Sequence, residues 1–538
     1  MSAPLHLWPG PDDAPPELAK GRHLLAACPA ARTVSIPGGV LLDDWLDFPA
    51  RVEVEERARA ATRAWVEQRR AALTAEGTDL GWIWEVELLR DAFLPVGRLL
   101  ASVRAAVKGL GAERLEVHEL DPPTAGALVE ALAPLGCAVM ASGVAPLAVP
   151  DPLSSLSRAQ RLLIASGVGA PQRVRGSVLV VNAPTSLPVA KQLANGPGRR
   201  PVLDPASLPA LGKPALARTL WRGGWVGVPG GLRRRRSARK VRRALEAARK
   251  VPPPAEPAAE LAHERALELL GRRAPGTVAL VDRHARALAT GRIELVAVPF
   301  DSLSSVRVLL AATRDAGVPS LLVQHGYAPE PNDPDKGQAD HTAAWAERDA
   351  REVRGRHGRE ATVTGNPAAP AGASPSRPAS GRPTLALVQS PTVFSARWDA
   401  RVSQRFVAQA LRTLEEDRPG SEVLLRPHPL EPSPDAFLRL VPEGSSLRVQ
   451  VDVRTPLDRL LAQCDACIGG VSTATLEAGV AGLRTTFLNV TGSELPEPFE
   501  REGELEQERL AEALGVVGRP PATQRVLDLI DQLAAASA

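Results

Sequence analysis

The sequence predicts an α/β fold built from doubly wound parallel sheets. Short apolar runs, typical of strands buried on both faces, alternate with helical patterns that carry one apolar face. The chain also holds 51 prolines and 44 glycines, which favours many short elements joined by turns over a few long helices. Its 538 residues are several times the length of a typical domain of ~150 residues, so we expect two or more domains.

The alternation of strands and helices is clearest in the C-terminal third. Strands are predicted at residues 384–389, 422–425, 447–451, 466–468 and 485–488. Helices are predicted between them, at residues 402–414, at residues 457–464 after a cap at Thr455, and from about Ser472. Elements that alternate at this rhythm indicate a parallel sheet with helices on both faces.

The residues before this stretch repeat the rhythm. Strands are predicted at residues 114–117, 138–141, 178–181, 277–281, 293–298, 320–323 and 362–364. Helices are predicted at residues 53–73, 86–107, 283–289 and 306–316. Residues 366–383 are rich in Pro, Ala, Gly and Ser and show no apolar period, as expected of a linker.

Four regions follow from this pattern. We predict an N-terminal domain over residues 1–370 with a basic, Trp-containing insertion near 216–250, a linker over 371–383, a C-terminal domain over 384–520, and a final helix within 521–538. No repeat of fixed period is visible, so the two halves share an architecture and not a repeated sequence.

Composition and charge exclude several classes of protein. Apolar residues make up 44% and charged residues 23%, enough for a buried core and a hydrated surface. The 65 basic and 61 acidic residues are balanced, so charge alone does not require a nucleic-acid partner. Four cysteines are too few for a disulfide scaffold, which favours the cytosol, and we interpret the Cys464 and Cys467 pair as core packing. No secretory signal is predicted, and prolines and glycines interrupt the apolar stretch at 131–150, which argues against a membrane span.

The first candidate site follows the predicted strand at 466–468, because ligands bind outside the carboxyl ends of strands in such sheets. Two glycines come next, and then a helix that opens with hydroxyl residues. Free amide groups and the positive end of the helix dipole favour phosphate there. Glu477 lies one turn after Thr473 on the same helix face, where it could meet a ribose hydroxyl. The simpler alternative is that Ser472 or Thr473 only caps the helix.

Three further strand ends carry polar residues. The strand at 422–425 runs into Arg426-Pro427-His428-Pro429, where prolines fix the backbone around an imidazole and the arginine suits a phosphate. The strand at 320–323 ends in Gln324-His325-Gly326, directly before Tyr327, the only tyrosine of the chain. The strand at 362–364 continues into Gly365-Asn366-Pro367. Taken alone, each has an ordinary alternative: a solvated strand edge, a structural histidine or a plain turn.

Taken in order, the four segments resemble those of the glycosyltransferase B (GT-B) superfamily, in particular bacterial enzymes of capsule and surface-polysaccharide assembly. The resemblance covers about residues 277–490. It implies two Rossmann-like domains that face each other across a cleft, with a final helix that crosses back to the N-terminal domain. Three alternatives stay open: a CDP-polyol phosphotransferase of the teichoic-acid type, a non-hydrolysing sugar-nucleotide 2-epimerase, and a non-catalytic protein that binds a nucleotide sugar.

The resemblance also implies roles for single residues. Gly470, Ser472, Thr473 and Ala474 would hold the donor diphosphate, Glu477 the ribose, and Arg426 and His428 the leaving phosphate. Gln324, Gly326 and Asn366 would line the cleft, with His325 on the acceptor side. Glu119 and Asp121 follow the predicted strand at 114–117 and are candidates for the general base, with a solvated turn acid as the plain alternative.

The predicted function is a metal-independent glycosyltransferase that moves a sugar from a nucleotide-sugar donor to a surface-glycan or lipid-linked acceptor at the cytoplasmic membrane face. No cofactor or metal is expected, because the helix start and the nearby cations share the charge of the leaving phosphate. Trp221, Trp225 and the cluster Arg233–Arg243 predict contact with an anionic membrane surface, hence a cytoplasmic protein peripheral to the plasma membrane. A solvated basic helix is the alternative, and nucleic acid is not expected because the cluster lacks interleaved aromatic residues.

Overall fold

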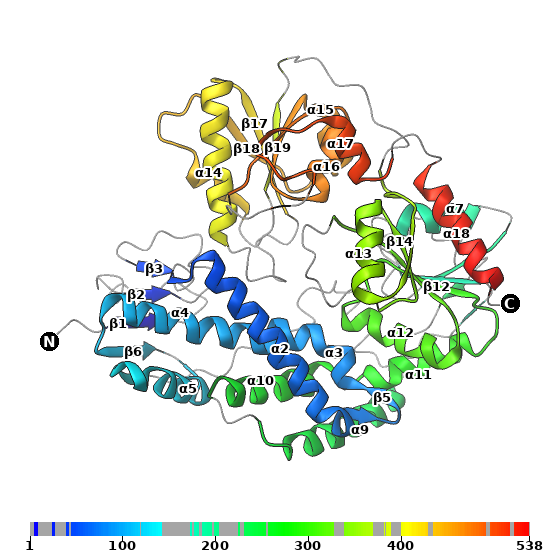
Figure 1. Cartoon of the computed structure of the whole chain (residues 1–538), viewed down its shortest axis with the longest axis horizontal. Coiled ribbons are helices and arrows are strands. Elements are labelled where there is room, and N and C mark those ends of the chain that lie inside the picture. Colours follow the sequence, from blue (N-terminus) through cyan, green and yellow to red (C-terminus); the bar gives the residue numbers. More distant parts are fainter. Residues whose placement is uncertain are drawn as a thin grey trace. The chain divides into compact units, whose positions relative to one another are not determined.

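The computed structural model shows an α/β chain whose described residues form three large sheets (Figure 1). The structure describes residues 5–8, 24–26, 39–41, 45–118, 120–142, 173–174, 177–181, 186–195, 198–203, 224–225, 231–253, 257–327, 338–369, 381, 383–388, 400–428, 434–490, 495, 497–516 and 521–536. Of the sequence predictions, Glu119, Trp221 and most of the linker at 371–383 lie outside these residues. Contacts divide the chain into unit 1 (Met1–Arg161, Ala238–Pro275 and Ser390–Gln404) and unit 2 (Leu162–Ser237, Gly276–Gln389 and Arg405–Ala538), which are described separately.

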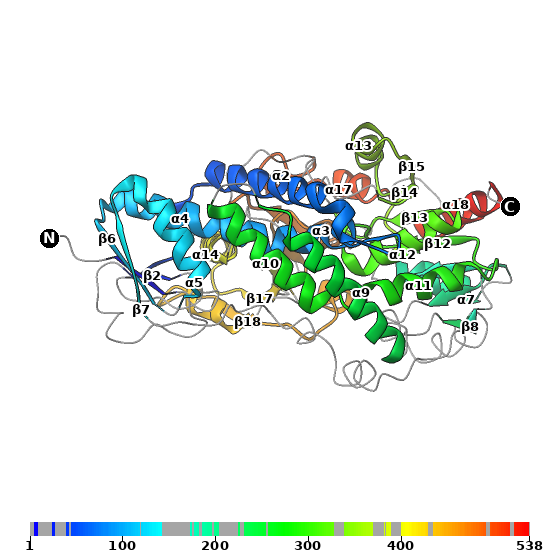
Figure 2. The same cartoon turned by 90° about the horizontal axis from the view of Figure 1, so that it is seen from below.

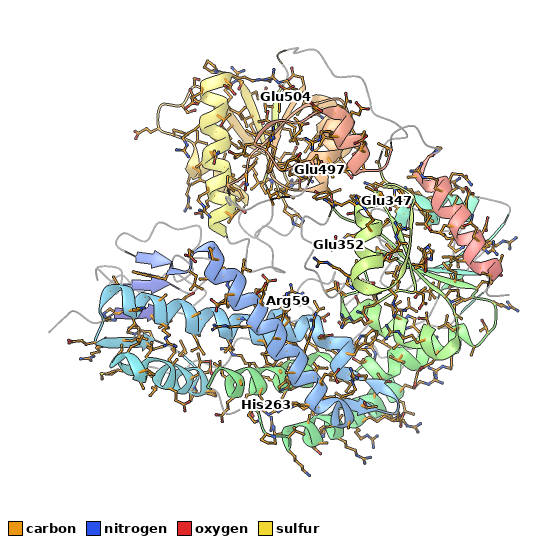
Figure 3. The ribbon with its side chains drawn as sticks, in the orientation of Figure 1. Arg59, His263, Glu347, Glu352, Glu497 and Glu504 are labelled. Carbon is orange, nitrogen blue, oxygen red and sulfur yellow. The ribbon has the colours of Figure 1, made fainter. Side chains whose placement is uncertain are left out.

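Unit 1 contains a parallel five-stranded sheet in the order β3-β2-β1-β6-β7. Its strands are β1 (Leu5–Trp8), β2 (Leu24–Ala26), β3 (Gly39–Leu41), β6 (Arg114–His118) and β7 (Ala138–Ser142), and β4 (Thr74–Ala75) with β5 (Thr78–Asp79) form a small hairpin. Its helices are α2 (Phe48–Leu73), α3 (Leu80–Leu88), the π-helical turn η3 (Leu89–Phe93), α4 (Leu94–Leu110), α5 (Pro122–Leu132), most of α9 (Gly231–Arg249) and α10 (Pro257–Arg273). Figure 2 shows α10 beside α4 and α5. In this helical layer Nε1 of Trp65 donates to Nδ1 of His263 at 2.9 Å, a buried contact between α2 and α10. Figure 3 labels His263 on α10.

Unit 2 contains an eight-stranded sheet in the order β15-β14-β13-β12-β9-β10-β11-β8, parallel except for the pair β11 and β8. Its strands are β8 (Arg173–Val174), β9 (Val178–Val180), β10 (Pro201–Leu203), β11 (Gly224–Trp225), β12 (Leu295–Val298), β13 (Ser320–Val323), β14 (His341–Ala344) and β15 (Glu360–Val363). The helices around it are α7 (Ser186–Asn195), α11 (Thr277–Leu288), α12 (Ser304–Ala316) and α13 (Glu347–His357).

The predicted strand at 277–281 is wrong, because these residues form the first turns of α11. Val278, Val281 and Leu288 are all buried and recur at helical spacing. A five-residue apolar run is equally compatible with a buried strand and a buried helix, and here the helical continuation to Leu288 decides the outcome.

Unit 2 also contains a six-stranded sheet in the order β18-β17-β16-β19-β20-β21, with only the pair β20 and β21 antiparallel. Its strands are β16 (Thr384–Val388), β17 (Glu422–Pro427), β18 (Arg448–Val451), β19 (Ala466–Gly469), β20 (Arg484–Phe487) and β21 (Gly503–Glu504). Its helical elements are α14 (Ala400–Asp417), the 3₁₀ turn η6 (Pro434–Leu440), α15 (Leu457–Gln463), α16 (Thr473–Val480), α17 (Gln507–Ala513) and α18 (Ala522–Ala536). The strands and helices predicted here are confirmed. The predicted cap at Thr455 is wrong, since Pro456 precedes α15 and the Thr455 amide instead donates to Oδ1 of Asp452 at 2.8 Å.

Both sheets of unit 2 are doubly wound. After the short edge strand β8, the chain builds the eight-stranded sheet from β9 outward through β10 and β11, and then returns to add β12 to β15 on the other side of β9. It builds the six-stranded sheet from β16 outward through β17 and β18, and then returns to add β19 to β21 on the other side of β16. Crossover helices join the parallel strands in each sheet. The predicted α/β class with two Rossmann-like sheets is therefore confirmed. The stretch 1–370, predicted as one domain, carries two of the three large sheets.

The final helix, α18, packs on the eight-stranded sheet of unit 2. Its buried side chains Val526, Leu529 and Ile530 share a core with Val178 and Leu295 of β9 and β12. Figure 1 shows α18 beside α7, and these two helices are in contact. The chain thus enters the six-stranded sheet and then returns to the sheet before it.

The interpretation of Cys464 and Cys467 as core residues is confirmed. Both are free thiols that are at most 1% exposed, in a core shared with Leu385 and Leu387 of β16. Burial raises the pKa of the Cys467 thiol, so it stays protonated and inert.

Candidate functional site

The candidate site lies at the switch point of the six-stranded sheet. The chain builds β16, β17 and β18 and then returns to place β19 on the other side of β16, so the carboxyl ends of β16 and β19 form the topological switch point of the sheet. Helix α16 begins a few residues after β19 ends at Gly469. Its first turn therefore lies where open α/β sheets bind their ligands.

The first turn of α16 is held by hydroxyl groups. Oγ of Ser472 accepts a hydrogen bond from the Thr475 amide at 3.2 Å and lies 2.9 Å from Oγ1 of Thr475, which donates to the Gly470 carbonyl at 2.8 Å. Gly469 is required here, since a Cβ on it would lie 2.3 Å from Oγ1 of Thr475. Ser472 acts as the N-cap, as in the simpler alternative, and its hydroxyl is engaged inside the turn.

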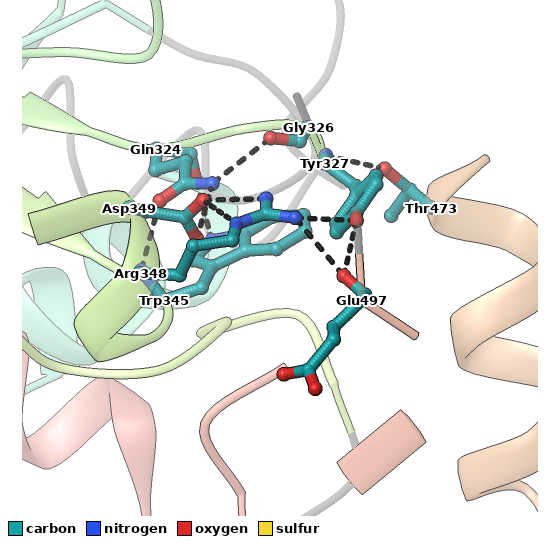
Figure 4. A network of polar contacts seen from close by, with 8 residues as sticks. All are labelled: Gln324, Gly326, Tyr327, Trp345, Arg348, Asp349, Thr473 and Glu497. Carbon is teal, nitrogen blue, oxygen red and sulfur yellow. Dashed lines mark hydrogen bonds and ion pairs between the residues drawn. The ribbon is translucent and has the colours of Figure 1, made fainter. Parts of the chain in front are cut away.

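Thr473 joins the start of α16 to the Gln324-His325-Gly326 segment. Its Oγ1 accepts a hydrogen bond from the Tyr327 amide at 2.9 Å (Figure 4). Among the described residues nothing accepts the Thr473 hydroxyl proton, or binds the first amides of α16, those of Thr473 and Ala474. Since a hydroxyl donates one bond while accepting others, Thr473 and these two amides present three donors at one helix start.

Gln324 fixes the loop that carries Tyr327. Its Oε1 accepts from the Trp345 amide at 2.8 Å, its Nε2 donates to the Gly326 carbonyl at 3.1 Å and to Oδ2 of Asp349 at 3.2 Å, and its carbonyl accepts from Nε1 of Trp345 at 2.8 Å (Figure 4). The side-chain amide thus ties the end of β13 to the start of α13 and holds the Tyr327 amide in place.

Tyr327 anchors this loop to the segment after β20. Its hydroxyl donates to the Glu497 carbonyl at 2.5 Å, and its ring packs edge-on against Phe499 with 5.3 Å between ring centroids. The Arg348 guanidinium lies over the ring at 4.4 Å and also donates to the Glu497 carbonyl at 3.0 Å. Burial raises the pKa of Tyr327 to about 12, so its proton stays in the hydrogen bond.

Asn366 and Glu477 meet beside this first turn. Asn366 is fully buried: its amide donates to the Leu514 carbonyl at 2.8 Å and its Oδ1 accepts from the Ala368 amide at 2.9 Å. Its Nδ2 is buried and has no hydrogen-bond partner among the described residues. Burial raises the pKa of Glu477 to about 7, and the nearby Asn366 amide offsets part of that effect without reaching hydrogen-bonding geometry. A buried amide donor without a partner among the described residues and a half-buried carboxyl therefore lie close together. This is the state expected of groups that bind a polar ligand.

A contact between two glycines positions Asn366. Gly365 and Gly515 have φ angles of 80° and 64°, and a Cβ on Gly515 would lie 2.0 Å from the Trp345 carbonyl oxygen. Arg525 of α18 clamps the contact, donating to the Thr364 carbonyl at 2.6 Å and to the Gly515 carbonyl at 2.7 Å. Two backbones approach here more closely than any side chain would allow.

Arg426, His428 and His325 lie at other strand ends. Nη1 of Arg426 donates to the Asp452 carbonyl at 3.0 Å and lies 3.6 Å from Oδ1 of Asp452, so its guanidinium braces the loop after β18. His428 follows β17, which is separated from β19 by β16, and partial burial of its ring lowers its pKa although the residue is exposed. His325 is exposed at the end of β13, with its ring edge-on to Phe300 at 5.6 Å. The predicted roles of these three residues stay predictions.

The predicted base candidates lie in unit 1. Asp121 is the N-cap of α5, where Oδ1 accepts from the Thr124 amide at 3.0 Å, and its Oδ2 lies 3.8 Å from Nη2 of Arg265. It lines an open groove of about 650 Å³ between α5, α9 and α10. Capping accounts for these contacts, and its role as a base is untested. Glu119 lies outside the described residues.

The structure thus brings together Thr473, Glu477, Gln324, Gly326 and Asn366, which three distant segments contribute. Sequence reasoning missed Arg348 and Glu497, because they act through a ring face and a backbone carbonyl that no motif records. Tyr327 was visible as the sole tyrosine of the chain, but its contact with Thr473 uses the backbone amide.

Comparison with known proteins gives a likeness in fold. No protein-family model matches the chain, and no curated protein matches it in sequence. The UDP-GlcNAc 2-epimerase of Neisseria meningitidis bound to UDP-GlcNAc is similar at 12% identity and a TM-score of 0.37, over 66% of this chain and 100% of that one. MurG of Acinetobacter baumannii is similar at 14% identity and a TM-score of 0.33, over 67% and 94%. UGT71G1 of Medicago truncatula complexed with UDP-glucose is similar at 12% identity and a TM-score of 0.38, over 67% and 99%. Similarities of this size assign no activity and no residue role. The two doubly wound, Rossmann-like sheets are established by the strand orders of this chain itself. Membership of the GT-B superfamily stays a prediction.

Proposed function

We propose that the chain is a glycosyltransferase that takes a nucleotide sugar as donor and binds its nucleotide diphosphate at the start of α16. One observation carries the proposal. At the switch point of a doubly wound sheet, the Thr473 hydroxyl and two helix-start amides lie one turn from the half-buried Glu477. Beside Glu477 lies Nδ2 of Asn366, which is buried and has no partner among the described residues. Donors at a helix start suit a diphosphate, and a carboxyl one turn further suits a ribose hydroxyl.

Transfer needs no bound metal in this proposal. The helix start and Arg426, which lies at the end of β17 two strands away from β19, supply positive charge for the leaving diphosphate. His428, which follows the end of β17, stabilises the leaving phosphate. His325 serves the acceptor, either by positioning it or by moving its proton. The acceptor is a surface glycan or a lipid-linked sugar at the cytoplasmic face of the membrane. His428→Ala should then lower turnover with every acceptor, whereas the effect of His325→Ala should depend on the acceptor.

A donor-binding experiment tests this proposal directly. Thermal unfolding with UDP-, GDP-, CMP- and CDP-linked sugars should reveal one class that raises Tm, because a ligand at a hundred times its Kd stabilises by ~2.7 kcal/mol. Transfer from that donor supports the glycosyltransferase. Interconversion of UDP-GlcNAc without an acceptor would indicate the epimerase, release of CMP from a CDP-polyol would indicate the phosphotransferase, and binding without turnover would indicate a non-catalytic protein.

Two substitutions localise the donor. Thr473→Val removes the proposed phosphate donor and Glu477→Ala the proposed ribose acceptor, and a lost charged hydrogen bond costs ~1.5–3 kcal/mol. Each variant should therefore bind the stabilising donor about tenfold more weakly or worse in calorimetric titration. Thr362→Val on β15 removes an exposed hydroxyl that is bonded to His341; it is the matched control and should bind as the wild type does. Unchanged affinity in both site variants would refute the assignment.

We further propose that α9 brings the enzyme to anionic lipid. Among the described residues no helix is long and apolar enough to cross a membrane. In α9, however, Arg236, Arg239 and Arg243 recur at helical spacing and are exposed, while Val241 and Ala244 on another face of the helix are buried. The small apolar face of α9 thus packs against the protein, and its exposed arginines form a row of positive charge that would attract anionic lipid. Trp225 belongs to strand β11.

Co-sedimentation with vesicles measures this attraction. Binding to vesicles that contain anionic lipid should fall steeply with salt, and replacement of Arg233–Arg236 by Ser should remove most of it, since each cation contributes ~1 kcal/mol near such a surface. Replacement of the exposed Arg351, Arg354 and Arg356 on α13 is the control. Equal binding to neutral and anionic vesicles would leave α9 as a solvated helix.

A further inference from the structure

A cluster of metal-ligating side chains lies in unit 1, away from the motifs considered so far. His6 of β1 and Glu116 and His118 of β6 each offer one ligand atom, and these atoms lie within 4.8 Å of one another. Nδ1 of His6 lies 3.1 Å from Nε2 of His118 and 3.4 Å from Oε2 of Glu116. All three residues are half-buried, so the cluster lies between the exposed surface and the apolar core.

The sheet register puts these three side chains together. β1 and β6 are parallel neighbours in which His6 lies opposite Glu116. Side chains two residues apart on a strand share a face, so His118 joins them. The opposite face of the same two strands is at most 1% exposed at Leu5, Leu7, Leu115 and Val117. A slip of the pairing by one residue would expose these four apolar side chains. Their burial therefore determines the register of β1 and β6, and this register places His6, Glu116 and His118 together.

The separations of the His6 nitrogen from the His118 nitrogen and from the Glu116 oxygen suit a tetrahedral ion. Zinc binds imidazole nitrogen at ~2.0–2.1 Å and carboxylate oxygen at a similar distance, which separates two ligand atoms of a tetrahedron by about 3.3 Å. The two separations in the cluster bracket this value. Nη2 of Arg114 lies 2.7 Å from Oε1 of Glu116, and such outer contacts orient a ligating carboxylate.

We propose that His6, Glu116 and His118 bind a divalent transition-metal ion of the zinc class. Two imidazoles and one carboxylate leave a fourth position for water or another ligand. The ion would join β1 to β6 and stabilise the N-terminal sheet. The proposal concerns unit 1 and does not depend on the glycosyltransferase proposed for unit 2. Its rival is a plain set of polar contacts, in which His6 bonds to His118 and Glu116 with no ion.

Metal titration of the full chain distinguishes a metal site from a plain set of polar contacts. The chain is freed of metal with a chelator and dialysed, and Zn²⁺ is titrated by calorimetry while Co²⁺ is followed by its visible absorption. We expect one equivalent of each ion, with zinc bound at micromolar Kd or tighter. Glu116→Gln and His118→Gln should each weaken zinc binding at least tenfold. The control His357→Asn removes a histidine at the end of α13 and should bind as the wild type does.

Thermal unfolding gives a second readout. Zinc should raise Tm of the wild type and of His357→Asn, and should raise it much less in Glu116→Gln, because only an ion that binds the folded chain stabilises it. Glu116→Gln keeps the shape of a half-buried side chain, so we expect it to fold. It therefore tests the metal site even if His118→Gln does not fold. No saturable equivalent in the wild type, or equal binding by Glu116→Gln, overturns the proposal. Donor binding is measured without zinc, so the failure of one proposal does not imply the failure of the other.

Discussion

Gly515→Ala is expected to lower the free energy of unfolding by about 3–5 kcal/mol, the range of severe backbone strain and overpacking. At the φ of 64° that Gly515 adopts, a Cβ alone costs about 1–2 kcal/mol. That Cβ would also lie 2.0 Å from the Trp345 carbonyl oxygen and 2.8 Å from the Gly365 Cα. Neither contact is with a side chain that could rotate away, so the backbones must separate. Urea unfolding followed by circular dichroism measures the loss.

Gly358→Ala is the matched control. Gly358 ends α13 at a φ of 57°, and nothing lies within 4 Å of the Cβ it would carry, so only the conformational cost of about 1–2 kcal/mol applies. The two variants should also differ in donor affinity, because the Asn366 amide donates to the carbonyl of Leu514, the neighbour of Gly515. Equal losses of stability in both variants would contradict the close approach of Gly365 and Gly515.

Burial on both faces made much of the six-stranded sheet predictable. β16 and β19 are fully buried and show as uninterrupted apolar runs. β14 is also buried along most of its length, but its sequence of one His, one Thr and two Ala carries no strand signal. Its strand conformation comes from its two parallel neighbours, β13 and β15, which sequence periodicity does not reveal.

The members of the candidate site were more predictable than their contacts. Gln324, Asn366 and Thr473 lie within a few residues beyond a strand end, where the topology of a parallel sheet directs attention, and Glu477 lies one helical turn after Thr473. The contacts between them depend on main-chain groups, such as the Tyr327 amide on Thr473 and the Leu514 carbonyl on Asn366. Every residue has such groups, so sequence alone does not identify which ones meet.

Glu477 links stability to pH, because burial raises the pKa of its carboxyl from an ordinary 4.5 to about 7. Between these two pH values the folded chain holds a proton that the unfolded chain has released. The contribution of this group to stability is therefore complete below about pH 4.5, falls as pH rises toward 7, and is lost above that. A pKa difference of this size corresponds to at most about 3 kcal/mol.

Glu477→Gln should consequently be more stable than the wild type at about pH 8, by up to about 3 kcal/mol, and equal to it at about pH 4, where both side chains are neutral. Urea unfolding at the two pH values measures the difference, with Glu504→Gln on the exposed strand β21 as the control that changes little at either.

The ionisation of Glu477 should also govern the affinity for the donor. If a ribose hydroxyl donates to the charged carboxylate, its binding favours the ionised form, so wild-type donor affinity should rise through about pH 7 by up to about tenfold. Glu477→Gln should bind the donor more weakly and without that rise. A wild-type affinity that is flat across this range would show that the donor makes no contact with an ionising Glu477, even if the stability difference is found.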